Sequence, residues 1–142
     1  MDERELVQQL ASKSHRLAAM RALVGGAAAT ELRNVAVRER AFAALRDGVS
    51  DPNPRIRWWS IQLLDHVADP RAIAAIAGAL DDPVPRVRRN AAHALGCVGC
   101  KPDWQDPLPP HLSAALARLA DADPNAKVRD EARRALASRT CR

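Results

Sequence analysis

Apolar residues recur along the chain at intervals of three and four, the spacing that places them on one face of an α-helix. In the segment that begins at Asp51, this stripe runs through Ile56, Ser60, Leu63 and Leu64. Every periodic segment of the chain has this helical spacing. The pattern therefore predicts an all-α protein.

The segment 51–64 is repeated twice without gaps, at 82–95 and at 123–136. Each copy opens with an aspartate followed by a proline. Aspartate can accept hydrogen bonds from free backbone N–H groups at a helix start, and proline is tolerated in the first helical turn. Each copy is therefore expected to begin a helix sharply.

Each repeated helix follows a segment rich in Ala and Leu, so the repeating unit is predicted to be a pair of helices joined by a short turn. These first helices are expected at 35–47, 70–80 and 109–120. A helix pair cannot bury its apolar face alone, whereas stacked neighbours can. We therefore expect about three helix pairs stacked on one another.

Residues 1–142 are interpreted as a single domain. Its N-terminal part is predicted to be a helical cap with one helix over 2–24, because Leu6, Leu10 and Leu17 lie near one helical face. A Pro-rich insertion separates the second and third pairs and is predicted to be a loop. The expected boundaries are 1–34 for the cap, 35–66, 70–96 and 109–138 for the helix pairs, and 97–108 for the loop insertion.

The recurring pattern Asp-Pro-x-Pro-x-Val-Arg-x-x-Ala-x-x-Ala-Leu resembles HEAT repeats, specifically the short bacterial form named after phycobilisome lyase subunits. This resemblance covers residues 35–138 and implies a right-handed α-solenoid whose second helices line a concave, protein-binding surface. It also implies a ladder of turn aspartates and helix arginines between neighbouring repeats. The ladder residues are Asp51, Asp82, Asp123, Arg57, Arg88 and Arg129. Ala126 departs from the pattern because the other two copies have proline there, which predicts that the last repeat is a terminal cap.

Composition and charge limit the environment and the partners. The chain carries a formal net charge of +5, which permits acidic partners such as nucleic acid or an anionic protein surface. Three cysteines give no even disulfide framework, so a reducing cytoplasm is expected. No apolar run approaches the roughly 18 residues that a membrane span requires. The sequence therefore predicts a cytoplasmic protein that does not span a membrane.

The candidate partner-binding residues are the positions of the second helices that stay off the apolar stripe. Two rows are expected to run side by side along the concave face, one with Trp59, Asn90 and Glu131 and one with Gln62, His93 and Arg134. The two tryptophans either lie in the core or anchor a partner, since Trp is both well buried and frequent at binding hot spots. The full candidate set is Trp58, Trp59, Gln62, Arg89, Asn90, His93 and Arg134.

A mixed surface of this kind favours another protein or a peptide as the partner, with nucleic acid as the alternative. Phosphate binding needs several cations on one face, and Asp130 and Glu131 interrupt the basic stripe. Alkylpurine DNA glycosylases also use HEAT-like repeats, and Trp58, Trp59 and Asp65 invite that comparison. Their catalytic positions cannot be matched to this sequence residue by residue.

The sequence has no Gly-rich phosphate loop, nucleophile elbow or His-Glu-x-x-His pair, so no enzymatic activity and no organic cofactor are expected. The pair Cys97 and Cys100 has a spacing found in metal sites, and His93 precedes it by one helical turn. These three residues are a candidate zinc site. The alternative is a pair of reduced, inert cysteines at the end of a helix.

Overall fold

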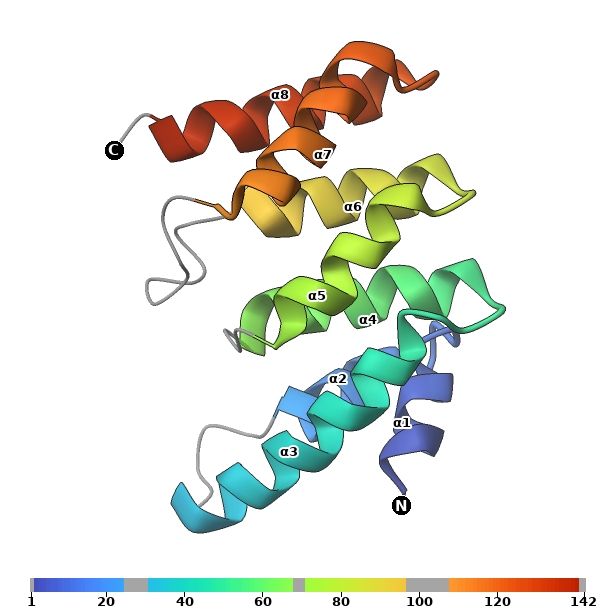
Figure 1. Ribbon diagram of the computed structural model, residues 1–142. Coiled ribbons are helices and arrows are strands. Elements are labelled where there is room, and N and C mark those ends of the chain that lie inside the picture. The colour runs from blue at the N-terminus through green and yellow to red at the C-terminus, as the bar shows by residue number, and fades with distance from the viewer. Residues whose placement is uncertain (1, 25–30, 68–70, 97–107, 141–142) are drawn as a thin grey trace. The chain divides into compact units, whose positions relative to one another are not determined.

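The computed structural model describes residues 2–24, 31–67, 71–96 and 108–140 (Figure 1). In these ranges every regular element is a helix, which confirms the predicted all-α class. None of the helices described is long and apolar enough to cross a membrane. The chain divides into two compact units, Met1–Val67 and Ala68–Arg142, which are described in turn. The expected division into a cap and repeats within one domain stays a prediction.

The first unit contains α1 (Glu3–Gln9), α2 (Arg16–Val24), α3 (Glu31–Gly48) and α4 (Pro54–Val67). Helix α3 packs against α4, and α1 and α2 pack against each other and against α3. Leu10, Leu45, Ile61 and Leu64 are fully buried between these helices. The apolar stripe of α4 thus faces the core of the unit.

The single helix expected over 2–24 was wrong, because the structure has two helices with a break at residues 10–15. In the break, the hydroxyls of Ser12 and Ser14 each lie 3.1 Å from Nδ1 of His15. Serine side chains that bond locally compete with helical backbone bonds. Arg16 stabilises the break, because its Nε donates a hydrogen bond of 2.7 Å to the carbonyl of Leu10, which follows the last residue of α1.

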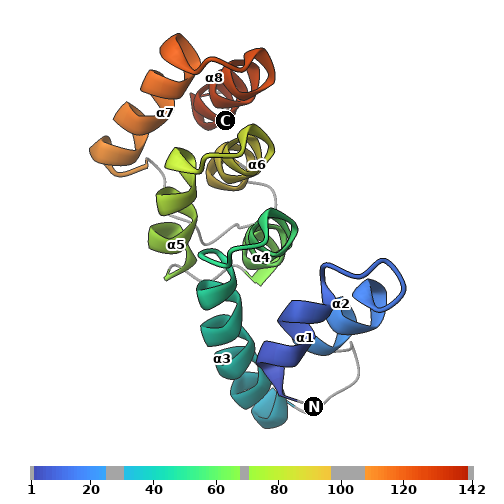
Figure 2. The same ribbon diagram turned by 90° about the vertical axis from the view of Figure 1, so that its right-hand side faces the viewer.

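The second unit contains α5 (Ala72–Gly78), the 3₁₀ helix η1 (Ala79–Asp81), α6 (Pro85–Gly96), α7 (Pro110–Ala122) and α8 (Ala126–Thr140). The segment α5–η1 pairs with α6, and α7 pairs with α8. Helices α6 and α8 lie side by side (Figure 2). The 3₁₀ helix η1 also contacts α7. Two successive helix pairs are therefore stacked on each other within this unit.

Small residues allow α6 and α8 to approach closely. A Cβ atom added at Gly96 would lie 2.5 Å from both Cα and Cβ of Ala135, which is closer than real side chains allow. The stripe residues Val87 and Ala91 of α6 and Val128 of α8 are buried as well. The contact therefore requires glycine at position 96, not merely a small residue.

The turn aspartates act one step earlier than expected. The side chain of Asp51 accepts a hydrogen bond from the backbone N–H of Asn53 at 2.8 Å, and Asn53 in turn accepts one from the N–H of Arg55 at 2.9 Å. Asp123 and Asn125 repeat this arrangement before α8. The aspartate therefore holds the turn, and in these two repeats the asparagine caps the helix.

Candidate functional site

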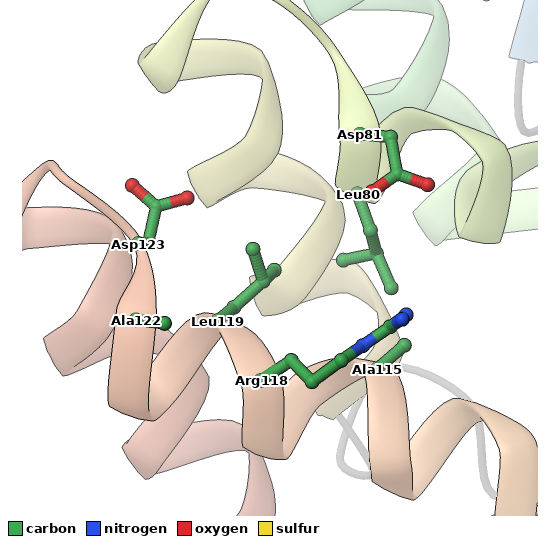
Figure 3. A pocket seen from close by; sticks show the side chains of 7 residues that line it. All are labelled: Leu80, Asp81, Ala115, Arg118, Leu119, Ala122 and Asp123. Carbon is green, nitrogen blue, oxygen red and sulfur yellow. The ribbon is translucent and has the colours of Figure 1, made fainter.

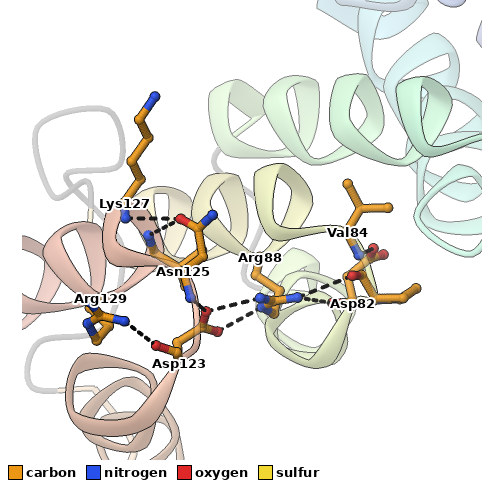
Figure 4. Close-up of polar contacts among 9 residues, drawn as sticks. Asp82, Val84, Arg88, Asp123, Asn125, Lys127 and Arg129 are labelled. Carbon is orange, nitrogen blue, oxygen red and sulfur yellow. Dashed lines mark hydrogen bonds and ion pairs between the residues drawn. The ribbon is translucent and has the colours of Figure 1, made fainter.

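The ladder contact within the second unit joins Arg88 of α6 to Asp123 in the turn before α8 (Figure 4). The guanidinium donates from Nε to Oδ2 at 2.8 Å and from Nη2 to Oδ1 at 3.0 Å, a two-point pairing. Its Nη1 donates to the backbone carbonyl of Asp82 at 2.8 Å. The two side chains are only 11% and 3% exposed, so this pair holds neighbouring repeats together and is not offered to a ligand.

The ion pair shifts the pKa values of both groups so that their charged forms are favoured. The hydrogen bond from Arg88 lowers the pKa of Asp123, with a further contribution from the N–H of Asn125, and outweighs the opposing effect of burial. The same hydrogen bond raises the pKa of Arg88. Both groups therefore stay ionised near neutral pH.

The other predicted ladder residues share one feature of this arrangement. Arg57 donates to the carbonyl of Asp51 at 2.9 Å, and Arg129 donates to the carbonyl of Asp123 at 2.7 Å. Each arginine thus fastens the turn that precedes its own helix. Asp51 accepts a hydrogen bond of 2.9 Å from the side chain of Gln8 in α1. A residue of the N-terminal region thus binds the aspartate of the turn before α4. Sequence analysis missed Gln8 because it lies outside the repeated pattern.

On α4 the structure brings Trp58 and Trp59 together with a residue that the sequence did not single out. The two rings meet edge to face, with centroids 4.7 Å apart and planes at 82°. The guanidinium carbon of Arg16 lies 4.7 Å from the centroid of the Trp59 ring. Both tryptophans and Gln62 are half-buried. The tryptophans are thus neither wholly core nor freely exposed, and α2 covers part of Trp59.

On the face formed by α6 and α8, three predicted binding residues converge on Glu131. The Nδ1 atom of His93 lies 3.1 Å from Oε1 of Glu131, while Nε of Arg89 and Nη1 of Arg134 each lie 3.6 Å from Oε2. The Glu131 side chain is 10% exposed, whereas those of Arg89, His93 and Arg134 are 46%, 51% and 70% exposed. We call these four residues the Glu131 cluster.

Two members of an expected exposed row are buried instead. Asn90 is 7% exposed and Glu131 is 8% exposed. The prediction that Asn90 is exposed for a partner was therefore wrong. Both occupy the position three residues after the first stripe residue of their helix, where Trp59 is half-buried on α4. This row is therefore turned inward, because close packing covers more of each second helix than the apolar stripe alone indicates.

The candidate zinc ligands cannot be assembled from the structure, because Cys97 and Cys100 lie outside the described residues. Among the residues that are described, no group of three or more His, Cys, Asp or Glu side chains could hold a metal ion. The Nδ1 atom of His93 faces Glu131. Zinc binding stays a prediction, which metal analysis of the purified full chain would test.

A shallow groove of 290 Å³ lies between η1 and α7 (Figure 3). Leucine and alanine side chains form much of its lining, with charged groups beside them. Its residues are Leu80, Asp81, Ala115, Arg118, Leu119, Ala122 and Asp123. The volume is just under the roughly 300 Å³ at which small-molecule sites begin, so we assign no ligand to this groove.

Comparison with known proteins identifies the class. The family model of HEAT repeats matches residues 3–96 and 42–137, so the chain belongs to the HEAT repeat family. The predicted resemblance to HEAT repeats, and with it the all-α solenoid class, is therefore confirmed.

Two solved structures are similar to the chain. Human deoxyhypusine hydroxylase in complex with glycerol is 26% identical, with a TM-score of 0.64 over 98% of this chain and 43% of that protein. An engineered protein is 20% identical, with a TM-score of 0.55 over 98% of this chain and 62% of that one, and shows the fold alone. The chain thus spans less than half of the hydroxylase. A search of curated proteins finds no match.

Proposed function

We propose that the chain is a non-enzymatic HEAT-repeat module, a scaffold or regulator, that binds another protein or a peptide through its second helices. The observation that carries this proposal is the Glu131 cluster, in which Arg89, His93 and Arg134 are presented from two adjacent second helices. HEAT repeats commonly mediate protein interactions, which supports the same conclusion. The phycobilisome-lyase subtype, a bacterial origin and a cytoplasmic location belong to this proposal and rest on the repeat pattern and the cysteine count.

The tryptophan pair on α4 supports the proposal independently. Half-buried Trp side chains combine a rigid apolar surface with low conformational entropy, which is why they are frequent at binding hot spots. The edge-to-face contact orients the two rings before any partner binds, and the guanidinium of Arg16 lies over the Trp59 ring. Trp59 is therefore a suitable anchor as well as a structural residue.

An enzymatic role is the second candidate, and the likeness to deoxyhypusine hydroxylase favours it. We place it second because the chain spans only 43% of that enzyme. The glycosylase comparison has less support, since Asp65 is almost completely buried within its unit. For nucleic acid, the carboxylates of Asp130 and Glu131 beside the arginines of α8 oppose a continuous basic surface.

Affinity capture from the native host, followed by binding measurements with the captured protein, tests the proposal. Trp59→Ala should weaken binding by about 2 kcal/mol, close to thirtyfold, while leaving the helical circular dichroism signal intact. Arg16→Met is the matched control, because it removes the cation over Trp59 but leaves both rings. It should bind the partner within about threefold of the wild type while melting earlier.

Two results would contradict the proposal. One is that no protein is retained specifically by the full chain. The other is a Trp59→Ala variant that binds the captured partner normally and only melts early, because Trp59 would then be a core residue alone.

A further inference from the structure

We propose that the Glu131 cluster recognises acidic segments of a protein partner, with one partner carboxylate bound between the guanidinium groups of Arg89 and Arg134. This inference rests on the proposed protein-binding function and names the chemistry of the partner. It concerns the second unit alone, where α6 and α8 are in direct contact.

The buried carboxylate holds the cationic groups in place. A carboxylate removed from water is stable only when charged or hydrogen-bonding groups compensate it. Glu131 obtains this compensation from two helices, through Arg89 and His93 of α6 and Arg134 of its own helix. The shared carboxylate therefore brings the two guanidinium groups together at one place on the surface before any ligand arrives.

Both arginines approach Glu131 loosely and keep much of their side chains in contact with solvent. A guanidinium has five N–H donors, and each arginine approaches Glu131 most closely through one nitrogen, Nε for Arg89 and Nη1 for Arg134. These approaches are 3.6 Å long, and the side chains are about half and more than two-thirds exposed. A carboxylate from solvent can therefore form the two-point pairing that arginine favours.

The charge balance of the cluster indicates how much negative charge it accepts. Two guanidinium groups and one carboxylate leave a surplus of one positive charge when His93 is neutral. One carboxylate from a partner would balance it. The neighbouring pair of Arg133 and Asp130 on the same helix is already balanced, with Nη1 and Oδ1 3.1 Å apart.

An acidic peptide fits this surface better than a nucleic acid does. A phosphate backbone carries closely spaced charges and needs a continuous row of cations. Here the exposed carboxylate of Asp130 lies on α8 near the cluster, and Glu131 lies at its centre. A peptide can place a single acidic side chain at the arginines and neutral residues beside Asp130.

Binding of a labelled hexaglutamate peptide with capped ends to the full chain tests this inference, with hexaglutamine as the matched neutral peptide. At low ionic strength, Arg89→Gln and Arg134→Gln should each weaken hexaglutamate binding by about tenfold. Arg133→Gln is the control variant, because it removes the same charge from the adjacent position of α8. It should weaken binding less than about twofold.

A further variant separates geometry from charge. Arg134→Lys keeps the charge but loses the planar pair of donors, so its affinity should lie between those of the wild type and Arg134→Gln. Arg134 is mostly exposed, and circular dichroism should show that these variants fold like the wild type.

Three results would overturn the inference. Hexaglutamate binds no better than hexaglutamine, or Arg133→Gln weakens binding as much as Arg134→Gln, which would mean a general charge effect. The third is that hexathymidylate displaces hexaglutamate and binds more tightly, which would favour nucleic acid. The Trp59 experiment with a captured partner uses a different helix, so failure here and failure of the proposed function can be told apart.

Discussion

Replacing Arg88 with methionine should lower the unfolding free energy more than the same replacement of Arg57 or Arg129, which also bond to the turn before their own helix. Methionine retains much of the aliphatic volume but removes the two bonds to Asp123, at 2.8 and 3.0 Å, and the bond to the carbonyl of Asp82 at 2.8 Å. Removing one partner of a buried ion pair costs about 3–5 kcal/mol. Asp123 keeps a hydrogen bond from the N–H of Asn125, so we expect a value near the lower end, about 3 kcal/mol.

Arg129→Met provides the matched control for this prediction. Arg129 donates to the carbonyl of the turn before its helix, as Arg88 does, but the described residues show no carboxylate in a following repeat for it to bind. Its loss should cost about 1 kcal/mol. Urea unfolding followed by circular dichroism measures both variants, and a double-mutant cycle with Asp123→Asn isolates the pair. If Arg88→Met costs no more than Arg129→Met, the ion pair between repeats contributes nothing measurable and the reasoning is refuted.

The same pair predicts a pH dependence. The pKa of Asp123 is lowered by the hydrogen bond from Arg88, so the folded state favours the ionised carboxyl more than the unfolded state does. This contribution is complete above the unfolded carboxyl pKa of about 3.9 and is lost as the pH falls through the lower, folded value. The difference in unfolding free energy between wild type and Arg88→Met should therefore be constant near neutral pH and shrink below about pH 4.

Three further substitutions probe the contacts of the helices. Gly96→Ala should cost about 2 kcal/mol or more, because the new Cβ would lie 2.5 Å from Cα of Ala135, whereas Gly78→Ala should gain about 0.5–1 kcal/mol because Gly78 is helical and has open space around it. Thermal melting compares Gly96→Ala with Gly78→Ala, and equal melting temperatures would contradict the close approach of α6 and α8. Arg16→Met should lower the unfolding free energy by about 2 kcal/mol, since it removes both the bond to the Leu10 carbonyl and the cation over Trp59. A neutral result in urea unfolding would show that Arg16 does not hold the first unit together.

The second helices could be predicted from sequence because their signals are local and repeated. The stripe residues Val87, Ala91 and Val128 are buried as their spacing indicates, and α4, α6 and α8 begin within a few residues of the Asp-Pro or Asp-Pro-Asn turns. The helical period and the turn chemistry depend on near neighbours in the chain. The pairing of Arg88 with Asp123 in the next turn was expected from the resemblance to HEAT repeats.

The tertiary structure alone decided which off-stripe residues reach the surface. Asn90 and Glu131 are buried, although their spacing predicted that they would be exposed. Arg16 and Gln8 make contacts that could not be predicted, because both residues lie outside the repeated segments. The rotation of a helix about its axis depends on how closely its neighbours approach, and here a glycine permits unusually close contact. Local spacing determines which residues share a helical face, but only the packed neighbours determine how much of that face remains in water.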